Sequence, residues 1–183
     1  MRLHRKKSTK LAGFTLIEAM ISIVVLSIGI LSLLAVYAQG IFLASLSQYD
    51  YVAEKKAEQS VEAIFTARDI KLLTWSSIQN VSQTGVFLDG PQPVLVPGPD
   101  GLVGTVTDES SAHEFITIGP GPDGVLGTSD DQIVDLNPWM TRTIAISQVT
   151  GETNLRMITV TINYQVGKLN RTYTLVSYIS AFA

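Results

Sequence analysis

A single carboxylate interrupts a long apolar stretch near the start of the chain. Between Lys10 and Asp50 the only charged residue is Glu18. The run from Ala19 to Ala38 holds 20 residues without a charge, and a helix of that length, rising about 1.5 Å per residue, spans the roughly 30 Å hydrocarbon core of a bilayer. The sequence therefore predicts a membrane-spanning helix. It also makes Glu18 a candidate functional residue, because an ionisable side chain in such a segment normally has a partner.

Charge is divided unevenly along the 183 residues. Five of the 13 basic residues precede Leu11 without an accompanying acid, which leaves eight basic against 16 acidic residues in the rest of the chain. This asymmetry predicts a cytoplasmic leader, residues 1–13, and a C-terminal domain on the other side of the membrane. The acidic remainder argues against nucleic-acid binding. The absence of cysteine excludes a disulfide framework and thiolate chemistry.

The boundary between the leader and the apolar run resembles the processing site of bacterial type IV prepilins and pseudopilins. It reads Gly13-Phe14-Thr15-Leu16-Ile17-Glu18. The resemblance implies that a prepilin peptidase cuts after Gly13 and that the new N-terminus, Phe14, is methylated. It also implies that Glu18 pairs with the Phe14 amine of a neighbouring subunit as the helix leaves the bilayer and joins a filament. Pairing of Glu18 with its own amine, one helical turn away, stays open.

Two other interpretations of this N-terminus compete with the prepilin one. An ordinary secretory signal would have a shorter apolar core, although Val36-Tyr37-Ala38 fits a small-residue cleavage site. A permanent single-span anchor explains the length of the apolar run but leaves the Gly13–Phe14 junction and Glu18 unexplained. The prepilin interpretation accounts for all of these features together.

A helical pattern continues beyond the membrane segment. Apolar side chains recur at steps of three and four residues, at Val52, Ala53, Ala57, Val61, Ile64 and Phe65. The pattern predicts one helix from Phe14 to about Arg68, near 80 Å long at roughly 1.5 Å per residue. Residues 14–40 would form its membrane and filament-core part, and residues 41–72 its amphipathic part.

The composition changes after the helix. Residues 73–141 hold the prolines and most of the glycines, and they contain a Pro-Gly-Pro-Asp-Gly turn in two copies, at 97–101 and 120–124. This segment is predicted to be rich in loops.

The last part of the chain, residues 142–183, is typical of strands. Period-two alternation predicts antiparallel strands near 142–149, 157–166 and 171–180. Their apolar face needs a cover, which the amphipathic part of the helix can provide. The predicted fold class is therefore α+β, with a long N-terminal helix packed on a small antiparallel β-sheet. This arrangement is the pilin fold that the resemblance implies.

Three carboxylates accompany the second copy of the turn, at Asp123, Asp130 and Asp131. Calcium prefers about six to eight oxygen ligands, from carboxylates and carbonyls. Residues 121–133 resemble the calcium-binding loop near the C-terminus of the major pseudopilin of type II secretion, and the resemblance makes these three residues the candidate ligands. A solvated turn without calcium is the alternative. A poorer version of the same site follows the first copy, at Asp100, Asp108 and Glu109.

Catalysis has little support in the sequence. The histidines are His4 in the leader and His113 beside Glu114, which we expect at the surface, and there is no Gly-x-Ser-x-Gly elbow, Walker loop or cysteine nucleophile. We therefore expect no enzymatic activity, and calcium is the only candidate cofactor.

The function implied by the resemblance is that of a structural subunit of a type IV pilus-like filament. Residues 14–34 look most like the PilV-type minor pilins. A pseudopilin of type II secretion or DNA uptake is the alternative within the superfamily. A membrane-anchored binding protein that never polymerises is an alternative from another class. The implied partners are other pilin subunits, the prepilin peptidase and the pilus assembly machinery of the inner membrane, from which the subunit would enter an extracytoplasmic filament.

Overall fold

The computed structural model describes residues 13–108 and 112–182. The chain forms two compact units, Met1–Ser45 and Leu46–Ala183. The helix α1, Leu16–Asp69, contributes to both. Residues 1–12 of the leader, which include His4, lie outside the described residues. The candidate ligand Glu109 also lies outside them.

The predicted helix is confirmed as a single element of 54 residues. Its buried side chains all belong to the second unit, at Leu46, Ala53, Ala57, Ser60, Ile64 and Ala67. The helix ends at Asp69, and Lys71, two residues later, adopts a left-handed conformation with φ of 60°. The amide of Lys71 donates to the carbonyl of Arg68 and that of Leu72 to the carbonyl of Ala67, so the last carbonyls are satisfied in the pattern of a Schellman motif.

The main sheet has four antiparallel strands in the order β1-β4-β5-β6. Their bounds are Gln92–Pro93, Met140–Gln148, Leu155–Val166 and Leu169–Ser180. The three long strands form the predicted meander, with Ile144 opposite Val160 and Val160 opposite Leu175. Each of these three strands begins two residues before its predicted start. The backbone pairing between neighbouring strands extends beyond the residues in which apolar and polar side chains alternate clearly.

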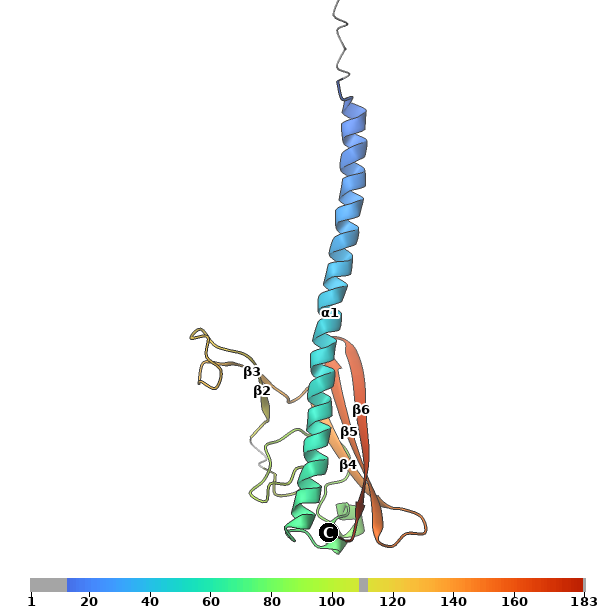
Figure 1. Cartoon of the computed structure of the whole chain (residues 1–183), viewed down its shortest axis with the longest axis vertical. Coiled ribbons are helices and arrows are strands. Elements are labelled where there is room, and N and C mark those ends of the chain that lie inside the picture. Colours follow the sequence, from blue (N-terminus) through green and yellow to red (C-terminus); the bar gives the residue numbers. More distant parts are fainter. Residues whose placement is uncertain (1–12, 109–111, 183) are drawn as a thin grey trace, which may run out of the picture. The chain divides into compact units, whose positions relative to one another are not determined.

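The core lies between this sheet and the second part of α1. On β5 the inward residues Ile158, Val160 and Ile162 are fully buried. They belong to the same apolar cluster as Ala57 and Ile64 of the helix, and the alanine allows the helix backbone to approach the sheet closely. The structure thus confirms the α+β class, with a long helix packed on an antiparallel sheet (Figure 1).

The segment predicted to be rich in loops also contains short regular elements. It holds the 3-10 helices η1, Trp75–Ser77, and η2, Val81–Gln83, and a hairpin of β2, Phe115–Gly119, and β3, Gln132–Asp135. The hairpin carries the second copy of the repeated turn at its tip (Figure 1). Strands β2 and β3 have five and four residues, all of them exposed or half-buried, and they are too short for the long alternation that identified the other strands.

Asn80 completes the outer edge of the main sheet. The short strand β1 pairs only with Thr141 and Arg142 of β4. Further along β4, the buried Asn80 side chain donates from Nδ2 to the carbonyl oxygen of Ile144 at 2.7 Å and accepts at Oδ1 from the amide of Ile146 at 2.8 Å. One amide side chain therefore takes the place of a neighbouring strand.

We expect Asn80→Ala to lower the free energy of unfolding by about 2–6 kcal/mol, because it leaves a buried carbonyl and a buried amide unpaired, at about 1–3 kcal/mol each. Denaturant unfolding of the detergent-solubilised chain, followed by tryptophan fluorescence, measures this change. The control is Asn154→Ala, at an exposed position, which should change stability by less than about 0.5 kcal/mol. Equal effects of the two changes would contradict the role given to Asn80.

Candidate functional site

The predicted processing junction is accessible within the chain. Gly13 and Phe14 precede the first helical residue, Leu16, and the Phe14 side chain is 74 % exposed. A Cβ added at Gly13 would meet no atom of the described residues within 4 Å. The fold therefore imposes no requirement for glycine at this position, so any such requirement comes from a molecule that acts on the junction.

The start of α1 is stabilised by Thr15. Its hydroxyl oxygen Oγ1 accepts a hydrogen bond from the backbone amide of Glu18 at 3.3 Å. The spacing Thr15-x-x-Glu18 is that of a capping box, and an acid in the first turn interacts favourably with the helix dipole. Sequence reasoning missed this second role of Glu18, although the spacing was visible in the printed sequence.

The Glu18 carboxylate is exposed, and no hydrogen bond or ion pair of its side chain is found among the described residues. In the uncut chain the nitrogen of Phe14 is an amide and carries no charge. The pairing implied by the resemblance can therefore form only after cleavage, and it stays a prediction.

The first unit presents an apolar helical surface. The large apolar side chains from Leu16 to Leu43 are between 39 % and 81 % exposed. The most apolar 18-residue window of α1 has a mean hydropathy of 2.7, and among the described residues α1 alone is long and apolar enough to cross a membrane. The helix supports the predicted membrane segment by length and composition.

Serine hydroxyls within this surface are satisfied by the helix itself. The Oγ atoms of Ser22, Ser27 and Ser32 donate to the carbonyl oxygens four residues earlier, at 2.7–2.8 Å. Such bonds remove the cost of placing an unpaired hydroxyl in an apolar medium. Glu18 is the charged group of residues 16–38, and its side chain has no partner among the described residues.

A family model identifies this segment. Residues 9–34 match the prokaryotic N-terminal methylation motif. The matched segment contains the Gly13–Phe14 junction, Glu18 and the first part of α1. The motif supports a type IV pilin-like prepilin, a class of structural subunits rather than enzymes. No curated protein and no solved structure matches the chain.

The three candidate calcium ligands lie in the loop between β2 and β3, where their carboxylates accept hydrogen bonds from the loop. Asp123 Oδ1 accepts from the amide of Val125 at 2.8 Å, and Asp131 Oδ2 accepts from the amide of Gly127 at 2.7 Å. Asp130 Oδ1 accepts from the Thr128 hydroxyl at 2.6 Å, which lowers the pKa of that carboxyl below its ordinary value. The carboxylates thus stabilise the turn itself.

Within residues 13–108 and 112–182, no group of three or more His, Cys, Asp or Glu side chains is arranged to hold a metal ion. The hydrogen bonds of the loop are those expected of the turn without calcium, but each carboxylate has further lone pairs for a cation. Calcium therefore stays a prediction for Asp123, Asp130 and Asp131.

His113 anchors the base of the hairpin. Its Nδ1 lies 2.9 Å from Asp135 Oδ2, and its Nε2 lies 2.9 Å from Asn137 Nδ2. The backbone amide of Asn137 and then the hydrogen bond with His113 lower the pKa of the Asp135 carboxyl. Both ring nitrogens are used in these contacts, so the half-buried His113 has a structural position that the sequence did not reveal.

Proposed function

We propose that this chain is a structural subunit of a type IV pilus-like filament, cut between Gly13 and Phe14 by the prepilin peptidase and assembled through α1. The observation that carries the proposal is the match of residues 9–34 to the N-terminal methylation motif, at the start of a helix whose apolar side chains are exposed. An exposed apolar surface of this extent needs lipid or other helices around it.

The proposed mechanism is assembly without turnover. Cleavage creates a cationic amine at Phe14 in an apolar environment, where an isolated charge is costly and a hydrogen-bonded pair is tolerated. The Glu18 carboxylate of a neighbouring subunit is the anion of that pair. The partners in this mechanism are other pilin subunits, the prepilin peptidase and the assembly machinery of the inner membrane.

Within this class we propose a minor pilin. The stretch Leu26-Ser27-Ile28-Gly29-Ile30-Leu31 supports this assignment through its resemblance to PilV-type subunits. The basic leader supports an orientation with the C-terminal domain outside the cytoplasm. Before assembly the subunit would lie in the inner membrane as a single-pass protein.

Shearing filaments from the host cells tests the proposed function. A minor pilin should be recovered in the sheared filaments in a small amount relative to the main subunit, with the remainder in the membrane. A host strain without prepilin peptidase is the control, and there the chain should remain entirely in the membrane. Recovery only from the membrane in both strains would favour the anchored, non-polymerising alternative.

A pseudopilin of type II secretion is the second candidate, and the acidic loop between β2 and β3 is the observation that favours it. If that loop binds calcium, an excess of about 100-fold over Kd stabilises the fold by about 2.7 kcal/mol, which corresponds to a rise in Tm of about 5–10 °C for a chain of this size.

Melting of the full chain in detergent, with calcium or with chelator, measures this shift. Asp123→Asn should abolish it. The matched comparison is Asp100→Asn, because Asp100 accepts the equivalent hydrogen bond in the first copy, from the amide of Leu102 at 3.0 Å. A shift that is lost with Asp123→Asn and kept with Asp100→Asn assigns the calcium to the second loop. Equal melting temperatures with calcium and with chelator would remove the calcium proposal.

A further inference from the structure

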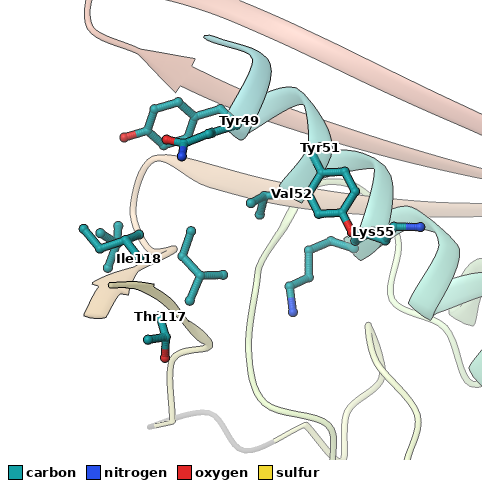
Figure 2. A pocket seen from close by; sticks show the side chains of 10 residues that line it. Tyr49, Tyr51, Val52, Lys55, Thr117 and Ile118 are labelled. Atoms are coloured by element: carbon teal, nitrogen blue, oxygen red, sulfur yellow. The ribbon is translucent and has the colours of Figure 1, made fainter. Parts of the chain in front are cut away.

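An open groove lies between the helix and the hairpin in the second unit. It has a volume of about 620 Å³ and is lined by α1 residues 48–56 on one side and by β2 and β3 on the other. Figure 2 shows Tyr51, Val52 and Lys55 of α1 on one side and Ile118 of β2 on the other. Tyr51 and Ile118 are each 60 % exposed. The groove therefore offers aromatic and aliphatic surface to a partner.

The charged residues that line the groove are both lysines, Lys55 and Lys56. Lys56 pairs with Glu114, and both of these side chains are largely buried. Lys55 pairs with Glu58 at 2.6 Å, but both side chains are close to half exposed. An exposed pair of this kind contributes little to stability, so Lys55 can turn to an acidic partner at low cost.

The two copies of the repeated turn share two hydrogen bonds between a carboxylate and a backbone amide at equivalent positions. Asp100 accepts from the amide two residues later, and so does Asp123. Asp108 accepts from the amide of Gly104 at 2.7 Å, just as Asp131 accepts from that of Gly127. The chain thus builds one loop conformation twice.

The apolar residues of the two loops have different surroundings. In the first loop, Leu102 and Val103 are 2 % and 1 % exposed, because they enter the core. In the second loop, the equivalent Val125 and Leu126 are 56 % and 65 % exposed. The first loop shows that this conformation presents two adjacent apolar side chains to an apolar environment. The second loop presents the same two positions, Val125 and Leu126, but no apolar surface of its own unit covers them.

We propose that the second loop, residues 120–131, docks into the groove of a second copy of this chain. Val125 and Leu126 would contact the apolar lining, and the acidic side chains beside them would face Lys55. The loop and one wall of the groove belong to the same hairpin, and Val125 and Leu126 lie outside that chain's own groove. The contact is therefore between copies.

This inference rests on the proposed function. A projecting loop on one surface and a groove on another make a head-to-tail contact, which repeats in one direction and suits a filament. One loop covers much less than the roughly 1,600 Å² of a stable interface. The contact therefore acts when the helices hold two copies close together, and it implies that the few copies of this minor subunit are incorporated next to one another.

Cysteine cross-linking of the full chain tests the contact, since the natural sequence has no cysteine. Cells would make two differently tagged forms, Leu126→Cys and Tyr51→Cys, and their membranes would be treated with a short bis-maleimide. The matched control pair is Val106→Cys with Tyr51→Cys, because Val106 is also apolar and is 74 % exposed. Tryptophan fluorescence of each variant checks that it is folded.

We expect the Leu126 and Tyr51 pair to give a mixed dimer in at least fivefold higher yield than the control pair. Adding Val125→Asp to the Leu126→Cys form should return the yield to that of the control. Equal yields for the two pairs, or a cross-link only to a different protein, would overturn docking between copies.

The N-terminal residue of the same samples is determined separately. A chain that begins at Phe14 but gives equal yields loses only the docking proposal. A chain that keeps its leader but gives the selective cross-link retains the docking proposal and loses the proposed function.

Discussion

Replacing Gly13 with valine is expected to leave the leader on nearly all copies of the chain and to remove the chain from filaments. The fold should be unaffected, because a Cβ at this position meets no atom within 4 Å in the part of the chain that the structure describes. The effect would arise at the peptidase, which must bring the backbone of the junction close to its catalytic groups, where a branched side chain obstructs the approach. Mass spectrometry of the membrane-bound chain measures the remaining leader.

The matched control is Gly40→Val, at another glycine where a Cβ would meet no atom within 4 Å. That variant should be cut as efficiently as the natural chain, although valine at a helical position changes the packing surface of α1. Normal removal of the leader from the Gly13→Val chain would contradict the assignment of the junction.

Changing Glu18 to glutamine is expected to preserve cleavage and to reduce incorporation into filaments about 100-fold or more. The backbone hydrogen bond from residue 18 to Thr15 Oγ1 does not depend on the side chain, so the helix start should persist. The charge of the Phe14 amine would then be left unpaired in an apolar interior, at a cost of about 3–5 kcal/mol, and each 1.4 kcal/mol is about a factor of ten in an equilibrium.

The ratio of the chain in sheared filaments to the chain in membranes measures this loss. Glu62→Gln is the control, because Glu62 is an exposed acid of the same helix in the second unit, and its replacement should leave the ratio unchanged. If Glu18→Gln and Glu62→Gln gave equal ratios, Glu18 would have no special role in assembly.

The elements with long periodic patterns could be predicted from the sequence. Apolar spacing over residues 52–65 indicated the helix, and alternation over 157–166 indicated the central strand β5. The end of the helix, expected at about Arg68, lies at Asp69, although Lys71 and not a glycine adopts the left-handed conformation that follows it. The alternating positions of β5 form the buried face of the sheet, as the pattern predicted.

Contacts between distant segments could not be predicted in this way. Nothing near Asn80 indicates that its side chain reaches Ile144 and Ile146, more than 60 residues away. The duplicated turn was visible as a repeat, but the sequence does not show that Leu102 enters the core while Leu126 stays exposed. That difference depends on tertiary packing, and it is the basis of the docking proposal.

The motif at the N-terminus differs from these contacts. Its residues indicate cleavage and methylation of the chain, but they do not indicate how their side chains are arranged. The spacing of Gly13, Phe14 and Glu18 lies within the matched segment 9–34. The described chain, with Glu18 exposed and Phe14 in an intact peptide bond, precedes the proposed cleavage. The proposed charge pair would form only in the processed molecule.

The mass of the N-terminal peptide of the mature chain, isolated from host membranes and filaments, shows whether the chain is processed as a prepilin. We expect a chain that begins at Phe14 and carries a methyl group on its amine. A chain that retains its leader, or one that begins at Gln39 after cleavage as an ordinary signal, would contradict this expectation.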